Sequence, residues 1–254
     1  MLAVVDAGNS NTVFGVFRGV ELVESFRLSS DQGRTADEYA ALLLPLFARA
    51  GIEASAVGSV VIASVVPPLQ GMLEELSRRL FGRRPLFVEP GVKTGLPIGL
   101  DNPVEVGADR IVNAVAARHL FGAPVVVVDF GTATTFDVVD AAGAYAGGLI
   151  APGIGIAAEA LFAHASRLCR VDVRRPPRLV GRNTAGAIQS GIYYGYVGLV
   201  DGILRRLQRE LPGLQAVVAT GGQAEMIAEG SELITRVEPL LTLRGLQLIH
   251  ERNR

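Results

Sequence analysis

The chain has 254 residues, 49% of them hydrophobic, and is therefore long enough for one large domain or two of modest size with a substantial core. Its 24 Lys and Arg residues nearly balance its 25 Asp and Glu residues, and the formal net charge of -1 argues against a nucleic-acid-binding protein. We expect its partners to be small molecules or copies of itself, with no nucleic acid among them.

The sequence also argues against a disulfide-rich protein, a zinc protein and a membrane protein. Cys169 is the single cysteine, and no cluster of Cys and His has the spacing of zinc ligands. The three histidines, His119, His164 and His250, are scattered, and we expect them at the surface or in helix packing. Asp6 interrupts the first apolar run, and no later run reaches the roughly 18 residues of a membrane span. These features predict a cytoplasmic protein with no membrane association.

In the first half of the chain, the pattern of apolar residues predicts three strands followed by alternating helices and strands. We expect Thr35 to cap a helix that Gly51 ends, and Pro67 to open a second helix at its first turn. The expected elements are strands at residues 2–5, 13–17 and 20–28, a helix at 36–50, a strand at 57–66, a helix at 67–81 and a short strand at 86–88.

Residues 89–103 are rich in glycine and proline and have neither helical nor strand periodicity. A loop of this length within a compact protein is usually either functional or disordered. It leads into a predicted helix at residues 104–121.

The second half repeats the opening theme of the first. Three strands come first and end at Asp129, Asp140 and Ile150, with a turn at residues 141–143. The basic run at residues 174–178 is interpreted as a solvated loop rather than a binding site. The remaining expected elements are helices at residues 153–165 and 184–211, a strand at 216–220 and a terminal helix at 240–251.

The long helix predicted at residues 184–211 carries apolar side chains in rough helical register. They are Ile188, Ile192, Tyr196, Leu199 and Ile203. This pattern is compatible with core packing and with a subunit interface, and both interpretations stay open at the level of sequence.

One motif occurs twice, as Asp6-Ala7-Gly8-Asn9-Ser10-Asn11-Thr12 and as Asp129-Phe130-Gly131-Thr132-Ala133-Thr134-Thr135. Both copies read Asp-x-Gly-x-x-x-Thr between two apolar runs, which predicts strand, tight turn and strand. Glycine lets the backbone approach a ligand, turn N–H groups and hydroxyls can cradle phosphate, and the Asp can hold a cation. A single turn of this kind is a common hairpin connection, but two matched copies facing one another would clamp the phosphate chain of a nucleotide.

Three more motifs accompany the two turns: Gly107-Ala108-Asp109-Arg110, Gly147-Gly148-Leu149-Ile150-Ala151-Pro152-Gly153, and Asn183-Thr184-Ala185 at a helix start. With this combination the chain resembles the type III pantothenate kinase family, a branch of the superfamily of acetate and sugar kinases, Hsp70 and actin. The resemblance extends from Met1 to the C-terminal helix.

The resemblance implies an α/β fold with two related actin-like (ribonuclease H-like) halves, each a mixed sheet opened by β-hairpins and flanked by helices. The expected halves are residues 1–118, with the first phosphate motif and the substrate loop, and residues 119–254, with the second phosphate motif. The turn Thr220-Gly221-Gly222 of the second half resembles the adenosine motif of the superfamily.

The activity implied by the resemblance is the ATP-dependent phosphorylation of pantothenate to 4'-phosphopantothenate, the first step of coenzyme A biosynthesis. Asp109 would be the general base that takes the proton of the pantothenate hydroxyl. Two alternatives are another small-molecule kinase of the same superfamily and a non-catalytic nucleotide-binding regulator. The Gly107-Ala108-Asp109-Arg110 motif argues against the first alternative, and the retained Asp6, Asp109 and Asp129 argue against the second.

The family's nucleotide and cation contacts map onto the two turns. Asp6 would also interact with Mg²⁺, directly or through water, and Asp129 with a monovalent cation, K⁺ or NH₄⁺, because hard cations prefer oxygen ligands. Ser10 stands where the family usually has Thr, and a hydroxyl is retained. The implied ATP-binding residues are Asp6, Ala7, Gly8, Asn9, Ser10, Asn11, Thr12, Val13 and Thr132.

The pantothenate contacts implied by the resemblance come from three parts of the sequence. The guanidinium of Arg110 would pair with the pantothenate carboxylate, and Thr184 would offer a hydroxyl at a helix N-terminus. Leu100 stands where family members often have an aromatic residue, so this side of the pocket departs from the family pattern. The implied substrate-binding residues are Leu100, Gly107, Ala108, Asp109, Arg110 and Thr184. The family works as a homodimer, and we expect the same here.

Overall fold

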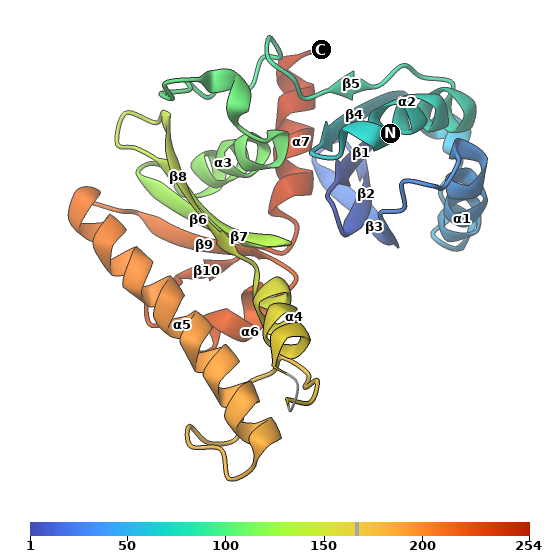
Figure 1. The fold of residues 1–254 in the computed structure, drawn as a ribbon. Coiled ribbons are helices and arrows are strands. Elements are labelled where there is room, and N and C mark those ends of the chain that lie inside the picture. The colour runs from blue at the N-terminus through green and yellow to red at the C-terminus, as the bar shows by residue number, and fades with distance from the viewer. Residues whose placement is uncertain (166–167) are drawn as a thin grey trace. The chain divides into compact units, whose positions relative to one another are not determined.

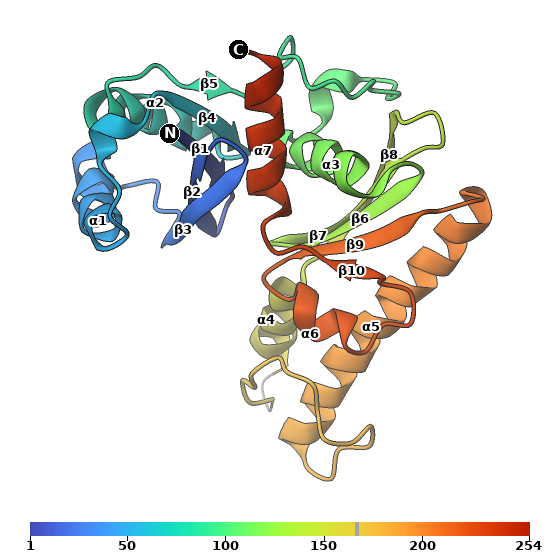
Figure 2. The same ribbon diagram turned by 180° about the vertical axis from the view of Figure 1, so that it is seen from behind.

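A computed structural model describes residues 1–165 and 168–254, which divide into two compact units (Figures 1 and 2). Unit 1 consists of Met1–Leu96, Asn102–Ala116 and Leu241–Arg254, and unit 2 of Pro97–Asp101 and Ala117–Leu240. The C-terminal segment therefore belongs to the same unit as the N-terminus. The placement of a boundary between duplicated halves at residue 118 stays a prediction.

Unit 1 is built on a five-stranded mixed sheet with the strand order β3-β2-β1-β4-β5. Its strands are β1 (Leu2–Ala7), β2 (Asn11–Arg18), β3 (Glu21–Ser29), β4 (Ser59–Ser64) and β5 (Leu86–Phe87). β1 pairs antiparallel with β2 and parallel with β4, so it lies in the middle of the sheet. A central strand is covered on both faces, which explains why its residues 2–5 are uniformly apolar.

Helices α1 (Ala36–Arg49) and α2 (Pro67–Phe81) cover one face of this sheet (Figure 1). The predicted ends are confirmed: Thr35 and Glu38 form a reciprocal capping box at the start of α1, and Pro67 opens α2. Gly51, directly after α1, has a φ of +66°, which suits glycine at a helix end. The other face packs against α7 (Leu241–Arg252), the expected terminal helix.

The helix that carries Asp109 begins later than expected. The prediction of a helix from residue 104 is wrong because Pro103–Glu105 form a separate 3-10 turn, η2, and Val106 has extended backbone angles. The α-helix α3 runs from Ala108 to Phe121. Its first turns are fixed in unit 1 by α7, where a Cβ on Gly245 would lie 2.2 Å from the carbonyl oxygen of Val112. Only glycine permits this close approach, so Gly245 helps to position the start of α3.

Unit 2 repeats the sheet of unit 1, with the order β10-β9-β6-β7-β8. The new strands are β6 (Val125–Phe130), β7 (Ala133–Val139), β8 (Tyr145–Pro152), β9 (Ala216–Gly221) and β10 (Arg236–Val237). As in unit 1, the first strand pairs antiparallel with the second and parallel with the fourth. Both second strands also shift register at a corresponding place, between Val16 and Phe17 and between Val138 and Val139. The duplication inferred from the motif is therefore a duplication of the whole sheet.

The helices of unit 2 cover one face of its sheet. They are α4 (Ile154–His164), α5 (Thr184–Glu210) and α6 (Ala224–Ala228), and they enclose a core with the alternate side chains of β6 and β7. The predicted helices at 153–165 and 184–211 are confirmed to within a residue or two. The short elements η1 (Ala54–Ala56), α6 and β10 were not predicted, because two to five residues carry too little periodicity.

Several smaller expectations can be compared with the structure. The strand expected at 57–66 is shorter, at Ser59–Ser64, because Val66 already leads into α2. His119 and His164 are exposed and His250 is half-buried, as expected for surface and packing histidines. Arg174, Arg175 and Arg178 are exposed on their loop, which supports the solvated-loop interpretation. Within residues 1–165 and 168–254, none of the helices has the length and apolarity needed to span a membrane.

Candidate functional site

The first Asp-x-Gly turn lies at the carboxyl end of β1, in the middle of the unit 1 sheet. Asp6 is half-buried on β1, and the turn closes with a hydrogen bond from the Gly8 N–H to the carbonyl oxygen of Asn11, 3.0 Å apart. Asn9, Ser10 and Asn11 are exposed, whereas Thr12 is fully buried and its hydroxyl lies 2.8 Å from that of Ser30. The turn thus presents polar groups to solvent, while the threonine that ends it is buried.

The second turn lies at the corresponding place in unit 2 but is one residue shorter. Ala7 pairs with Thr12 across the first turn, while Phe130 pairs with Thr134 across the second. The structural equivalent of Thr12 is therefore Thr134, and not Thr135 as alignment of the two motifs suggests. Thr134 is likewise fully buried, but in the described part of the chain its hydroxyl has no hydrogen-bond partner. The two copies have the same strand pairing but turns of different length.

Asp109 lies near the first turn, in unit 1. The Val65 N–H, directly after β4, donates to the carbonyl oxygen of Ala7, and Val65 also contacts the position that a Cβ on Gly107 would occupy, at 3.4 Å. The same Cβ would lie only 2.6 Å from Oδ1 of Asp109, so glycine at 107 leaves room for this carboxylate. The Arg110 N–H donates to Oδ1 of Asp109 at 2.8 Å and orients it. We call Gly107-Ala108-Asp109-Arg110 the substrate motif, because the family resemblance implies that it contacts the substrate. The substrate motif and the first turn are thus neighbours at one end of β1 and β4.

Burial raises the pKa of Asp109 above its ordinary value, although the hydrogen bond from the Arg110 backbone and the charge of the Arg110 guanidinium oppose the change. The carboxylate is half-buried at the start of α3. A carboxylate with a raised pKa accepts a proton more readily, and such groups concentrate at functional sites. Asp109 is therefore a candidate for the general base.

Asp129 in unit 2 lies against the glycines of the expected adenosine motif. Asp129 and Phe130 pair with Thr220 and Gly221, and the Gly222 N–H donates to the Phe130 carbonyl at 3.1 Å. Gly221 has a φ of +92°, and a Cβ there would lie 2.6 Å from Oδ1 of Asp129. Any side chain at position 221 would displace this carboxylate. The structure thus brings the second turn and the Thr220-Gly221-Gly222 turn together at the carboxyl ends of β6 and β9.

Thr132 is held by Gly153, the last residue of the glycine motif at residues 147–153. The Gly153 N–H donates to the Thr132 carbonyl at 3.2 Å, and a Cβ on Gly153 would lie 2.2 Å from that oxygen. The side chain of Thr132 is exposed. Gly153 precedes α4 as its N-cap, so the glycine motif at residues 147–153 fixes both the turn and the start of the helix.

Leu100 is attached to β8 through Tyr145. The Tyr145 N–H donates to Pro97 and the Tyr145 carbonyl accepts from Gly99, each at 2.8 Å, which adds a short parallel bridge to the edge of the unit 2 sheet. Leu100 Cδ2 lies 3.3 Å from the Cβ position of Gly147. The expected unstructured loop at 89–103 is therefore anchored in its middle.

Thr184 is the first residue of α5, as the motif predicts, but it is not the helix cap. Asn183 is the N-cap, and its Oδ1 accepts a hydrogen bond from the Gly186 N–H at 2.7 Å. Thr184 is exposed. Its hydroxyl is therefore not needed to cap the helix.

An apolar groove of about 510 Å³ lies between α4 and α5 in unit 2, and Thr184 is at its end. Its walls include Leu161, Leu168 and Tyr196, and the exposed Gly191 and Gly195 form part of its floor. Of the five apolar residues expected on α5, Ile188 and Tyr196 are buried in the core, while Ile192, Leu199 and Ile203 are half-buried against it. Core packing is thus confirmed for α5, and one side of the helix remains open.

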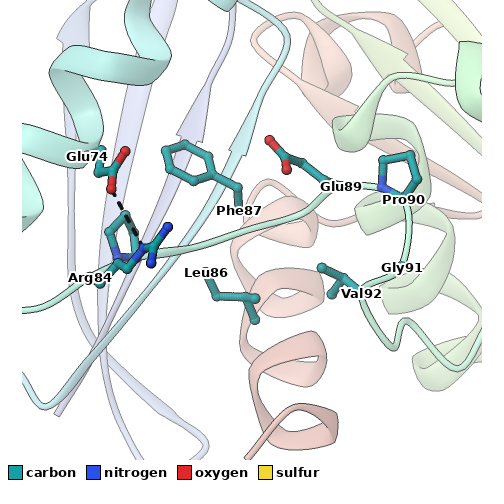
Figure 3. Close-up of a pocket in the computed structure, with 9 residues that line it drawn as sticks. Glu74, Arg84, Leu86, Phe87, Glu89, Pro90, Gly91 and Val92 are labelled. Carbon is teal, nitrogen blue, oxygen red and sulfur yellow. Dashed lines mark ion pairs between the residues drawn. The ribbon is translucent and has the colours of Figure 1, made fainter.

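A second hollow, of about 280 Å³, lies beside β5 in unit 1 (Figure 3). Figure 3 shows Glu74 and Arg84 paired at its rim, with Phe87 and Glu89 on the neighbouring strand and loop. None of the predicted site residues lines this hollow. It is therefore separate from the candidate site.

The described residues contain no group of three or more His, Cys, Asp or Glu side chains that could enclose a metal ion. A dedicated protein cage is not needed for Mg²⁺ in a nucleotide site, since Mg²⁺ is usually bound by one or two carboxylates together with water and phosphate oxygens. Asp6, half-buried at the carboxyl end of β1, can supply one carboxylate of that kind.

The sequence reasoning missed one polar cluster in unit 2. Asp137 on β7 is fully buried and accepts hydrogen bonds from the hydroxyls of Thr135 at 2.9 Å and Tyr145 at 2.7 Å. The sequence shows only an acidic residue within the apolar run of β7. The pairing of Thr135 with Asp129, which connects this cluster to the second turn, appears only in the register of the sheet.

The chain is similar along its full length to proteins that share one description. The family model described as type III pantothenate kinase matches residues 2–206. The chain is 54% identical over 254 residues to the type III pantothenate kinase of Geobacter sulfurreducens and 55% identical over 254 residues to that of Anaeromyxobacter dehalogenans, covering 100% of both chains in each case. The chain belongs to the type III pantothenate kinase family. It is accordingly a phosphotransferase.

Structural neighbours show the fold of this family more widely. A Campylobacter jejuni structure described as a Baf family transcriptional activator has a TM-score of 0.60 at 21% identity, covering 99% of this chain and 98% of the other. The ethanolamine utilization protein EutJ of Carboxydothermus hydrogenoformans has a TM-score of 0.56 at 15% identity, with coverage of 97% and 89%. At these identities the likeness shows the fold alone, and the expected α/β fold with two mixed sheets flanked by helices is confirmed.

The raised pKa of Asp109 gives a prediction for stability. A carboxyl group whose pKa is higher in the folded than in the unfolded state stabilises the fold at low pH, and this contribution is lost as the pH rises through the folded-state pKa. We therefore expect Asp109→Asn to be as stable as the wild type or more stable at neutral pH. The difference should vanish below pH 3.8, the ordinary pKa of the group.

Urea unfolding of both proteins across this pH range measures the effect. Asp101→Asn, which changes an exposed aspartate, is the matched control and should show no such trend. A wild type that is more stable than Asp109→Asn at neutral pH would contradict the burial argument.

Proposed function

We propose that this chain transfers the γ-phosphoryl group of ATP to pantothenate, giving 4'-phosphopantothenate in the first step of coenzyme A biosynthesis. The observation that carries the proposal is the placement of Asp109. Its half-buried carboxylate has a raised pKa, is oriented by the Arg110 N–H and lies in unit 1 near the end of β1. Membership of the type III pantothenate kinase family supports the choice of substrates.

Asp109 is the proposed general base. The primary hydroxyl oxygen of pantothenate attacks the γ-phosphorus, a new oxygen–phosphorus bond forms, and the bond to the bridging oxygen of ADP breaks. Asp109 takes the hydroxyl proton. In phosphoryl transfer, positioning and charge neutralisation supply most of the acceleration, so Asp109 orients the hydroxyl as much as it deprotonates it.

The first turn is the proposed binding element for the ATP phosphates. Its exposed residues Asn9, Ser10 and Asn11 offer N–H groups and polar side chains, and Thr132 on the second turn offers a further hydroxyl. The half-buried Asp6 would hold Mg²⁺, directly or through water. When bound, Mg²⁺ neutralises the charge of the phosphate oxygens.

Asp129 is the proposed ligand of a monovalent cation, K⁺ or NH₄⁺. The support is its carboxylate oxygen Oδ1 at the end of β6. This oxygen and the Phe130 carbonyl oxygen each lie 2.6 Å from the Cβ position of Gly221. A hard cation prefers such oxygen ligands.

Arg110, Thr184 and Leu100 are the proposed contacts for pantothenate. The guanidinium of Arg110 would pair with the pantothenate carboxylate through two parallel hydrogen bonds. The hydroxyl of Thr184 is supported as a ligand group because Asn183 takes the capping role. Gly107 and Ala108 would place backbone N–H groups at the start of α3, where a helix N-terminus favours polar or anionic groups.

The test of this function is a coupled assay of ADP release with ATP, Mg²⁺ and pantothenate, repeated with K⁺, NH₄⁺ or only Na⁺ present. We expect release to depend on pantothenate and to rise in K⁺ or NH₄⁺ because Asp129 supplies an oxygen site for these cations. A panel of sugars and other hydroxyl acceptors is the control. Release with a sugar but not with pantothenate would indicate another small-molecule kinase, and binding of ATP without any release would indicate a nucleotide-binding regulator.

We also propose a homodimer that is formed through the groove between α4 and α5. The open apolar side of α5 and the exposed Gly191 and Gly195 at the groove support this interface. A Cβ on Gly195 would meet nothing within 4 Å, apart from the backbone of its own helix turn, so the folded chain tolerates a side chain there.

The dimer prediction is tested with a matched pair of variants. Gly195→Arg places a charge in the groove and should convert the dimer to a monomer in sedimentation velocity. Gly198→Arg changes an equally exposed glycine of α5 outside the groove and should leave the dimer intact. A dimeric Gly195→Arg protein, or a monomeric wild type, would refute this interface.

A further inference from the structure

The buried carboxylate of Asp137 is a polar centre in unit 2 to which the proposed chemistry assigns no role. It is fully inaccessible and accepts hydrogen bonds from two hydroxyls, those of Thr135 and Tyr145. Removing a carboxylate from water is costly, so the fold keeps one in a core only where polar partners surround it. A carboxylate at this position therefore calls for an explanation beyond filling the core.

The duplication supplies an internal comparison. The register that pairs Val127 with Asp137 in unit 2 pairs Val4 with Gly15 in unit 1, and the position of Thr135 corresponds to that of Val13. Unit 1 thus has Val and Gly where unit 2 has Thr and Asp. The same sheet frame forms without these polar groups, so the fold itself does not require them.

The partner of Asp137 also has a counterpart. Directly after the register shift, Tyr145 pairs with Val139 in unit 2, and Leu22 pairs with Phe17 in unit 1. Leu22 is therefore the counterpart of Tyr145. In unit 1, Leu22 simply packs against Gly15, with its Cδ1 3.3 Å from the Cβ position there. In unit 2, the Tyr145 hydroxyl instead reaches Oδ1 of Asp137 at 2.7 Å. An apolar contact in one copy is replaced by a hydrogen bond to a carboxyl oxygen in the other.

Tyr145 is also the residue that anchors the loop carrying Leu100. Its backbone exchanges hydrogen bonds with Pro97 and Gly99, both at 2.8 Å, and its side chain is fully buried. Leu100 follows Gly99 in the chain and packs beside Gly147, which lies on β8 like Tyr145. The position of Tyr145 therefore determines the position of residues 97–100.

At its other end, the cluster reaches the strand that ends in the second turn. Thr135, which donates to Oδ2 of Asp137, pairs with Asp129 in the β6–β7 ladder. A continuous series of contacts thus runs from Thr135, which pairs with Asp129, through Asp137 and Tyr145 to the loop of Leu100.

We propose that Asp137 is a positioning residue that acts through Tyr145 to hold the Leu100 loop in the geometry for binding pantothenate. It makes no contact with substrate itself. The proposal rests on the proposed function, because it takes Leu100 as part of the substrate site. It assigns a role to the polar residues that distinguish the second hairpin from the first.

The main variant is Tyr145→Phe, which removes the hydroxyl and keeps the ring and both backbone hydrogen bonds. We expect the KM for pantothenate to rise about three- to tenfold, the range for losing one hydrogen bond, while the KM for ATP stays within about twofold. Exchange of the Gly99 amide, measured by hydrogen–deuterium exchange, should accelerate because its acceptor on Tyr145 is less firmly held.

The matched control is Tyr193→Phe. Tyr193 is a fully buried tyrosine of α5 in the same unit, and its hydroxyl donates to the Met226 carbonyl at 3.3 Å. Loss of this hydroxyl should leave both the pantothenate KM and the exchange of Gly99 at wild-type values. A double variant, Asp137→Val with Tyr145→Phe, removes this donor and its acceptor together, and is the second test protein if the single variant is unstable.

A folded Tyr145→Phe or double variant with wild-type pantothenate KM and wild-type Gly99 exchange would overturn the proposal. An equal rise in the KM of ATP and of pantothenate would also overturn it, because that indicates general loosening rather than positioning of one loop. If the wild-type chain does not turn over pantothenate, the proposed function fails separately, and the exchange of Gly99 alone then decides whether the cluster holds the loop.

Discussion

The close approach of a carboxylate oxygen to a glycine backbone fixes the candidate site in each unit. A Cβ on Gly107 would lie 2.6 Å from Asp109, and a Cβ on Gly221 would lie 2.6 Å from Asp129. In both places glycine creates room that no other residue leaves, and the carboxylate occupies it. The remaining structure holds these contacts in place: β1 and β6 are central strands, and their parallel neighbours β4 and β9 lead to the residues beside each carboxylate.

The duplication gives both units a sheet with the same strand order, and the two units differ in their turns and in their polar residues. The first turn is longer and more exposed, and lies near the substrate motif in unit 1, where Val65 contacts both. The second turn is one residue shorter and is tied by Gly153 to the start of α4. The polar cluster around Asp137 exists only in the second copy. In the proposed function, phosphate binding and proton transfer therefore draw mainly on residues of unit 1, and the cation residue Asp129 and the anchored loop of Leu100 belong to unit 2.

The sequence was sufficient for the parts of the fold that depend on local patterns. The apolar runs before Asp6 and Asp129, the cap at Thr35 and the proline that opens α2 all act within a few residues, and the elements they predict are present. The resemblance to the type III pantothenate kinase family came from short motifs with the same local character. These motifs also identified Asp109 and Gly221, whose neighbours the structure supplies.

What the sequence could not give depends on contacts between distant residues. The start of α3 moved to Ala108 because Pro103 forms its own turn, which helical periodicity does not register. The equivalence of Thr12 with Thr134 follows from strand pairing, while the motif alone points to Thr135. Asp137 looks like an ordinary strand residue until Tyr145 is placed beside it. Each of these features becomes visible only when the register of the sheet is known.

The central claim is that Asp109 is the base, and the most direct measurement is the single-turnover rate of phosphoryl transfer by Asp109→Asn at saturating ATP and pantothenate. The amide keeps the size of the side chain but cannot accept the proton, so the rate should fall by about 10²- to 10⁴-fold while ATP binding, measured by calorimetry, is retained. A folded Asp109→Asn protein that binds ATP and transfers phosphate at the wild-type rate would contradict the account.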